Sequence, residues 1–174
     1  MLLRGQPYDH PALFRIPALI YFPLNSPEID RKGLKPMHFC IYLYCPEKMP
    51  SFYRKAIGEY EKRLARYARI RFREIRREKE WRDLLSHAEN GWYLVPGESD
   101  SSEEFSRKLS AWERERRKEI FFFIGADEAE ESGNERLEPF SLSCFRMNAP
   151  MTAMILFEQI YRGYRIMHNH PYHK

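Results

Sequence analysis

The C-terminal segment, residues 161–174, contains side chains that can move protons, stack on flat rings and bind phosphate. Its sequence, YRGYRIMHNHPYHK, holds histidines at positions 168, 170 and 173, together with tyrosines, arginines and a terminal lysine. Imidazole gains and loses a proton near neutral pH, so histidine is a common general acid or base. Chain termini are usually the least constrained part of a protein. This density of reactive groups therefore predicts that the tail belongs to a functional site.

Two other interpretations of the tail remain open. In the first, Arg162 pairs with a carboxylate such as Glu158, and the tail only docks on the protein. In the second, the three histidines bind zinc as a His-x-His-x-x-His set, although no acidic or cysteine partner is evident. Cys40, Cys45 and Cys144 form no CxxC pair, which fits a reducing compartment better than a disulfide scaffold. The sequence therefore predicts no metal site.

An apolar helix is predicted to carry the tail. Apolar residues dominate from Ala149 to Ile166, directly after a strand-like segment. The pair His170-Pro171 cannot continue a helix, because proline lacks an N–H and disfavours the α conformation of the residue before it. We therefore expect the helix to end near Met167 and the tail to project from it.

Upstream, short apolar segments alternate with amphipathic ones, as strands and helices do. Ser51 is predicted to cap the first helix and Ser101 or Ser102 the third, whereas Asn90-Gly91 is predicted to end the second. This alternation is typical of an α/β fold, with a mostly parallel sheet and helices on both faces. The predicted strands are residues 38–44, 70–75, 92–95, 119–124 and 140–147, and the predicted helices are residues 52–67, 81–88, 102–117 and 149–166.

Length and composition fit one domain, residues 37–174, preceded by an extension. The chain has 174 residues, of which 43% are hydrophobic and 15% aromatic, so it can bury a core and is not disordered. Residues 1–36 contain six prolines, and we predict an irregular extension there. Translation from Met37 is the alternative. No segment has the roughly 18 uncharged apolar residues of a membrane span, and no signal peptide is predicted.

Three predicted strand ends are candidate ligand sites, because ligands bind beyond the carboxyl ends of strands in open α/β sheets. Glycine lets backbone approach a ligand closely, and exposed backbone groups can bind an adenine edge or an amino-acid end. Each segment alone is also typical of an ordinary turn. The segments are Leu94-Val-Pro-Gly97, Ile124-Gly-Ala126 and Ser143-Cys-Phe-Arg-Met-Asn148.

The order of these segments, together with the tail, resembles the RlmH family of methyltransferases. The tail carries the most specific likeness: Tyr-Arg-Gly, a spacer, then Asn-His-Pro-Tyr-His and a basic residue. The resemblance covers Met37 to Lys174 and leaves out residues 1–36. Other segments similar to the family are Lys48-Met49-Pro50, Glu59-Tyr60, Trp92–Gly97, Ile124-Gly125-Ala126 and Leu142–Asn148.

The resemblance implies a SPOUT-type α/β fold with a C-terminal trefoil knot whose loops bind S-adenosylmethionine. It also implies a homodimer, in which the tail of one subunit completes the pocket of its partner. The implied activity is methylation of N3 of a pseudouridine in 23S ribosomal RNA, in the cytoplasm. The implied cofactor-binding residues are Leu94, Pro96, Gly97, Gly125, Ala126, Ser143, Cys144, Phe145, Arg146, Met147 and Asn148.

Methyl transfer to such a nitrogen requires removal of its proton and alignment with the methyl group. His170 and His173 are the candidate general bases. Tyr172 is the candidate for orienting or stacking, and Arg162 or Arg165 is the candidate for binding phosphate. We therefore expect the catalytic residues to be Arg162, His170, Tyr172 and His173.

The chain departs from the family pattern at three alanines and one acidic segment. Ala126 replaces a second glycine, Ala149 replaces the histidine of a His-Pro pair, and Ala153 replaces a common arginine, while residues 127–131 are acidic. Two alternatives to the RlmH activity therefore stay open. One is a catalytically degenerate RNA-binding dimer, and the other is a SPOUT methyltransferase with a different RNA target.

A basic segment is the candidate RNA-contact surface. The net charge of +4 is mild, but arginine and lysine are crowded between residues 54 and 82, which suggests positioning of phosphates. A solvated helix surface gives the same count. Tyr53, Tyr60 and Tyr67 share a face with Leu64 and are predicted to pack in the core. The basic residues are Arg54, Lys55, Lys62, Arg63, Arg66, Arg69, Arg71, Arg73, Arg76 and Arg77.

Overall fold

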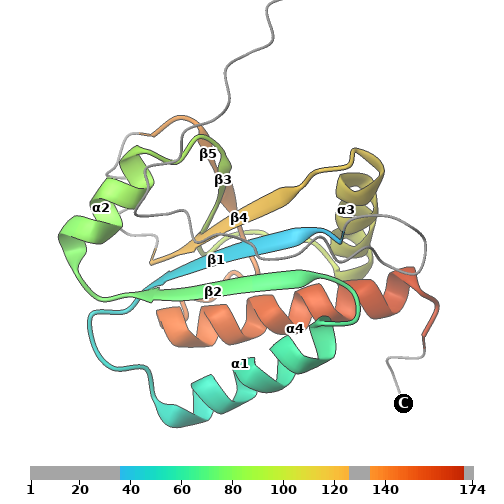
Figure 1. Cartoon of the computed structure of the whole chain (residues 1–174), viewed down its shortest axis with the longest axis horizontal. Helices are drawn as coiled ribbons and strands as arrows, with labels where there is room; N and C mark the ends of the chain where they lie inside the picture. The colour runs from blue at the N-terminus through green and yellow to red at the C-terminus, as the bar shows by residue number, and fades with distance from the viewer. Residues whose placement is uncertain (1–35, 126–133, 171–174) are drawn as a thin grey trace, which may run out of the picture.

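The computed structural model describes residues 36–125 and 134–170, which form one parallel sheet of five strands covered by helices (Figure 1). All four strand pairings are parallel, in the order β2-β1-β4-β3-β5. The predicted α/β fold with a mostly parallel sheet is confirmed. The predicted N-terminal extension lies outside the described residues. The strands are β1 (His38–Tyr44), β2 (Arg69–Ile75), β3 (Gly91–Leu94), β4 (Glu119–Ile124) and β5 (Leu137–Phe140).

Strands β1 and β4 lie side by side in the middle of the sheet and are buried on both faces. Ile41 pairs with Phe122 and Tyr42 with Phe123 in the parallel register, and all four side chains are at most 2% exposed. A strand covered on both faces needs a nearly continuous apolar run. This explains the composition of FCIYL and IFFFI in the two strands.

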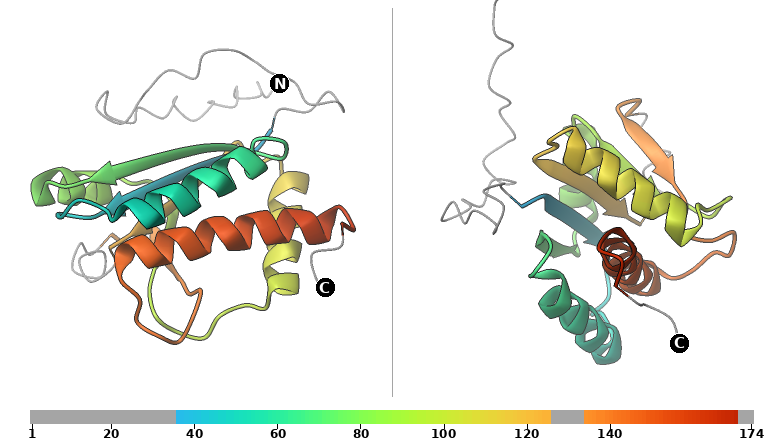
Figure 2. Two further views of the ribbon diagram at one scale, coloured as in Figure 1. Left: turned by 90° about the horizontal axis from the view of Figure 1, so that it is seen from below. Right: turned by 90° about the vertical axis from the view of Figure 1, so that its right-hand side faces the viewer.

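Three helices cover one face of the sheet. The helices are α1 (Ser51–Leu64), α3 (Ser102–Arg114) and α4 (Ala149–Met167), and α4 packs against both of the others (Figure 2). Ile57, Leu109 and Phe157, one from each helix, belong to a single apolar core with the sheet residues Phe39 and Phe122.

Helix α2 (Glu78–Ser86) packs on the opposite face, as the prediction of helices on both faces requires. Trp81 is fully buried there and stacks on Tyr44 at the end of β1, with 5.6 Å between ring centroids. In the part of the chain that the structure describes, no helix is long and apolar enough to cross a membrane.

Three local predictions were wrong. The fifth strand is Leu137–Phe140 rather than residues 140–147, which form a loop after it. Helix α2 begins at Glu78 and ends at Ser86, whereas Gly91 begins β3 with a φ of +141°. Ser51 is already helical, and Pro50 occupies the cap position without a side-chain hydrogen bond. A polar residue suited to a cap does not alone fix where a helix begins or ends, and helix boundaries commonly shift by one or two residues.

Candidate functional site

A cavity of about 460 Å³ lies beyond the carboxyl ends of β1, β3 and β4. Tyr44, Leu94 and Ile124 contribute from the strands, and the loop at residues 141–148 and the first turn of α4 close the other side. This is the edge of a parallel sheet at which ligands usually bind. A volume in the range of 300–1,000 Å³ is typical of small-molecule sites.

Backbone hydrogen bonds join the two segments that continue β3 and β5 past the sheet. The N–H of Val95 donates to the carbonyl of Phe140 at 3.0 Å, and the N–H of Gly97 donates to the carbonyl of Ser143 at 3.1 Å. The Ser141 hydroxyl donates to the carbonyl of Val95 at 2.8 Å. The loop at residues 141–148 is therefore held against residues 95–97 by main-chain contacts rather than by large side chains.

Gly125 shapes the cavity where β4 ends. Its φ of +123° lies in a region that favours glycine. A Cβ at this position would lie 2.7 Å from the Cβ of Tyr44, closer than such atoms approach. The chain therefore needs glycine here both for the backbone conformation and for the close approach of β4 to β1.

Asn148 fixes the start of α4 at the cavity wall. Its Oδ1 accepts a hydrogen bond from the N–H of Met151 at 2.9 Å, and Pro150 stands in the first turn. Asn148, Ala149 and Thr152 all line the cavity. The N-terminus of a helix carries partial positive charge. Pro150 has no N–H and that of Met151 is bonded to Asn148, so this wall favours a carboxylate or another anionic group mainly through the helix dipole.

Most of the predicted cofactor-binding residues lie at this cavity. Gly97 and Cys144 belong to the same loops but do not line the cavity, and Ala126 lies outside the described residues. The sequence reasoning missed Tyr44 and Thr152. Tyr44 ends a predicted strand and could have been found by the strand-end rule, whereas no signal marked Thr152. The predicted residues that line the cavity are Leu94, Pro96, Gly125, Ser143, Phe145, Arg146, Met147 and Asn148.

The predicted end of α4 at Met167 is confirmed, and His168 and Asn169 separate it from the His170-Pro171 pair. Asn169 has a φ of +52°. Its N–H donates to the carbonyl of Ile166 at 2.9 Å, and the N–H of His170 donates to the carbonyl of Arg165 at 2.9 Å. This is the Schellman pattern, in which a residue in the left-handed conformation satisfies the last helical carbonyls.

Two of the predicted catalytic residues, Arg162 and His170, lie toward the end of α4 that is away from the cavity. Arg162 is half-buried within α4 and His170 is exposed after it, whereas Tyr172 and His173 lie outside the described residues. Arg162 follows Thr152 by ten positions, or about 15 Å along the helix axis at 1.5 Å per residue. A single chain therefore does not bring the described catalytic candidates to the cavity.

Residues 37–173 match a family model described as "Predicted SPOUT methyltransferase". This chain belongs to the SPOUT methyltransferase family. Ribosomal RNA large subunit methyltransferase H 1 of Thermoanaerobacter sp. (strain X514) is 35% identical to it over 131 residues, which cover 73% of this chain and 92% of the relative. The methyltransferase H of Clostridium kluyveri is 31% identical over 145 residues (71% and 91%), and that of Neisseria gonorrhoeae is 30% identical over 145 residues (73% and 93%). The predicted resemblance to the RlmH family is confirmed.

In this SPOUT family member, the described residues offer no metal cluster beside the cavity. No group of three or more histidine, cysteine or acidic side chains in the described part of the chain could hold a metal ion. Burial raises the pKa of the Cys40 thiol to about 12, so Cys40 stays protonated at neutral pH.

Ala153, where the family commonly has arginine, is fully buried and therefore faces the core.

Proposed function

We propose that this chain transfers a methyl group from S-adenosylmethionine to N3 of a pseudouridine in 23S ribosomal RNA, and that it works in the cytoplasm. Its membership of the SPOUT family and the names of its relatives support an RNA methyltransferase. The observation that carries the proposal is the cavity at the carboxyl ends of β1, β3 and β4. Eight of the eleven residues that the family resemblance assigns to the cofactor line it.

The cavity fits a cofactor with an apolar adenosine part and a charged amino-acid part. Leu94, Ile124 and Leu142 line it with apolar side chains, while Ser143 and Asn148 add polar groups. Glycine at position 125 lets β4 end close to Tyr44 and so shapes the cavity wall, and the dipole at the first turn of α4 favours a carboxylate. We assign these residues to the cofactor.

S-adenosylmethionine, when bound, supplies an electrophilic methyl group on a sulfonium centre. The remaining chemistry falls to the chain. In this proposal an imidazole nitrogen of His170 or His173 accepts the proton from N3, which makes that nitrogen nucleophilic. Arg162 binds a phosphate of the RNA and fixes the ring relative to the cavity, and the ring of Tyr172 supports the base by stacking.

A homodimer would bring the two halves of the site together. The cavity lies at the first turn of α4 and His170 follows its last turn, so the two are separated by about 27 Å of helix and cap in one chain. In a two-fold dimer with the α4 helices antiparallel, each tail reaches the partner's cavity. Met151, exposed on the first turn of α4, and Phe145, 76% exposed in the loop before it, offer apolar surface for such contact.

The direct test is methyl transfer to ribosomes that lack the modification. Purified protein, tritiated S-adenosylmethionine and such ribosomes should yield label in 23S RNA, located on pseudouridine N3 by nucleoside mass spectrometry. Saturable cofactor binding without label in this RNA would favour another RNA target. A folded protein that binds RNA but no S-adenosylmethionine would favour the catalytically degenerate dimer.

Mixed dimers test the shared site. Gly125→Val disables the cavity and His170→Ala disables the tail, so each variant alone should be inactive. When the two are unfolded, mixed and refolded together, half of the dimers should be mixed, with one intact site of two. Activity should then return to about one quarter of the wild-type value. No recovery, with mixed dimers verified by mass spectrometry, would contradict a site shared between subunits.

A further inference from the structure

Four tyrosines pack against one another where α1 and α4 end, two of them half-buried and two buried. The two helices pack along each other (Figure 1). Tyr67, just after α1, stacks on Tyr164 with 5.3 Å between centroids and 5° between planes, and it lies 6.4 Å from Tyr161. Tyr60 of α1 lies 6.0 Å from the same Tyr161 ring. We call Tyr60, Tyr67, Tyr161 and Tyr164 the tyrosine cluster. The prediction that Tyr60 and Tyr67 pack against the core is confirmed.

Three arginines lie over the tyrosine cluster. The guanidinium of Arg63 lies 5.8 Å from the Tyr60 centroid and 5.9 Å from that of Tyr161, and Arg66 lies 5.7 Å from Tyr67. Arg165 of α4 lies 5.9 Å from the Tyr161 centroid and donates a hydrogen bond to its hydroxyl at 3.0 Å. A cation over an aromatic ring is attracted by the ring quadrupole, so these contacts hold the charges at fixed places.

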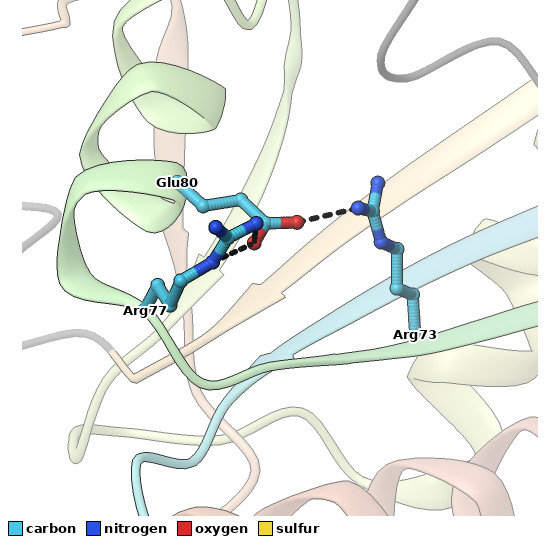
Figure 3. A network of polar contacts seen from close by, with 3 residues as sticks. All are labelled: Arg73, Arg77 and Glu80. Carbon is cyan, nitrogen blue, oxygen red and sulfur yellow. Dashed lines mark hydrogen bonds and ion pairs between the residues drawn. The ribbon is translucent and has the colours of Figure 1, made fainter.

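Arg63 and Arg66 differ from other arginines of the basic segment. Both are exposed, and within the described residues neither forms an ion pair with a carboxylate. By contrast, Arg73 and Arg77 converge on the carboxylate of Glu80 (Figure 3). A nearby carboxylate cancels much of the field that a phosphate would feel. The structure thus distinguishes arginines whose charge is neutralised by a carboxylate, such as Arg73 and Arg77, from Arg63 and Arg66, whose charge is available to a phosphate.

The surface continues into the tail. His168 stacks on Tyr67 with 5.2 Å between centroids and 21° between planes, and the His170 ring lies 6.2 Å from His168. Arg63 lies in the last turn of α1 and Arg66 in the turn that follows it. Because Arg66 lies over Tyr67, ring contacts connect it through His168 to His170, the predicted general base.

We propose that Arg63, Arg66 and Arg165, held over the tyrosine cluster, bind consecutive phosphates of the RNA strand and lead its target base to the tail. The inference rests on the proposed function, because only an RNA substrate gives the tail a base to receive. Guanidinium groups bind phosphate by paired, planar hydrogen bonds, and such contacts position an RNA without reading its sequence. The surface should therefore set affinity and salt dependence rather than the choice of nucleotide.

The test combines RNA binding with methyl transfer. Arg63→Gln/Arg66→Gln removes two charges at the tyrosine cluster, and Arg77→Gln/Arg82→Gln removes two ion-paired charges on α2 as a matched control. Fluorescence anisotropy with a labelled single-stranded RNA of mixed sequence, between 0.05 and 0.5 M KCl, gives the salt slope of binding. The loss of two phosphate contacts should reduce the slope by about 1.4 and the affinity about 20-fold at 0.1 M salt.

The control variant should change both quantities far less. Arg63→Lys/Arg66→Lys keeps the charges and should recover most of the affinity. Calorimetric titration with S-adenosylmethionine should give the wild-type affinity in every variant, because none of the substituted residues lines the cavity, and it reports correct folding. In methyl transfer, KM for ribosomes should rise with little change in kcat.

Equal losses in the Gln pair and the control would overturn the inference, and so would failure of the Lys pair to recover affinity. Binding of the wild-type protein to anionic vesicles but not to RNA would also overturn it. If wild-type protein fails to methylate ribosomes while the Gln pair still loses RNA affinity selectively, the proposed function fails and this RNA surface stands.

Discussion

The two ends of α4 are built in different ways. At its first turn the surroundings are mainly backbone: Gly125 in a conformation that favours glycine, the cap of Asn148, and main-chain bonds between residues 95–97 and 140–143. At its last turns the surroundings are rings and charges, from the tyrosine cluster to His168 and His170. One end offers a shaped cavity, and the other offers side chains that carry charge and protons.

This difference suggests a division of labour. A cavity shaped by backbone can hold a cofactor even if most of the side chains that line it are changed, as long as Gly125 can still lie close to Tyr44. A surface made of arginine, tyrosine and histidine depends on the identity of each side chain, because its contacts are specific to guanidinium, phenol and imidazole. Substitutions at the two ends should therefore affect different measurements.

The largest expected effect is on turnover, from the tail. His170→Ala should lower kcat for ribosome methylation about 10²- to 10⁴-fold, the usual contribution of a general base. Its affinity for S-adenosylmethionine should stay within about twofold, because in the proposed dimer His170 acts on the RNA base rather than on the cofactor.

The matched control for this change is His87→Ala. His87 is exposed beside α2 and bonds to the carbonyl of Asp83, so its loss should leave kcat unchanged. Single-turnover kinetics with labelled cofactor separate the chemical step from binding. A parallel loss of cofactor affinity in the His170 variant would remove the contrast between the two ends.

The next effect is on cofactor affinity and stability, from the cavity. Gly125→Ala places a Cβ 2.7 Å from that of Tyr44 and forces alanine to a φ of +123°. We expect the free energy of unfolding to fall by about 2–4 kcal/mol and the cofactor affinity to fall with it. Thermal unfolding and calorimetric titration measure the two quantities.

Gly58→Ala is the control for the added methyl group. Nothing lies within 4 Å of a Cβ at Gly58 in the middle of α1, so alanine should stabilise that helix by about 0.5–1 kcal/mol. Cofactor affinity should stay the same. If both alanine variants behaved alike, the special geometry of Gly125 would have no consequence for the cavity.

The sequence predicted the sheet better than the cavity loop. The sheet follows from hydrophobic patterns and is confirmed, whereas the role of the tail, which stands out because its residue types are rare together, stays a prediction. The cavity loop was wrongly predicted as a strand at residues 140–147, because Phe140, Leu142, Phe145 and Met147 read as strand-like. In the structure Phe145 is 76% exposed instead. The backbone bonds that fix this loop leave no mark on residue type, so the sequence could not predict its shape.

A smaller effect is expected at the N-terminal cap of α4. Asn148→Ala removes the acceptor for the N–H of Met151, which should lower the free energy of unfolding by about 1 kcal/mol. Because Asn148 also lines the cavity, cofactor affinity should fall severalfold.

Ser101→Ala in α3 is the matched cap variant. Ser101 accepts from the N–H of Glu104 at 3.2 Å in a capping box remote from the lining residues. Denaturant unfolding should show a similar loss of about 1 kcal/mol, whereas calorimetric titration should show unchanged cofactor affinity. Equal affinities in the two variants would mean that the first turn of α4 does not contact the cofactor.

The smallest effect uses a cysteine as a probe of the cavity loop. Cys144 is exposed, whereas Cys40 and Cys45 are buried and burial raises the pKa of both thiols. Since the thiolate is the reactive form, a thiol reagent at pH 8 should modify Cys144 alone in the native protein. Saturating S-adenosylmethionine should slow that reaction severalfold, because the loop that carries Cys144 also lines the cavity through Ser143 and Phe145. RNA bound at the tyrosine cluster of the same chain should not slow the modification of Cys144. RNA can slow it only if the partner's tail brings that RNA to the cavity. If RNA slows the modification in the wild type but not in His170→Ala/Arg162→Ala, the tail of one subunit meets the cavity of its partner in the dimer.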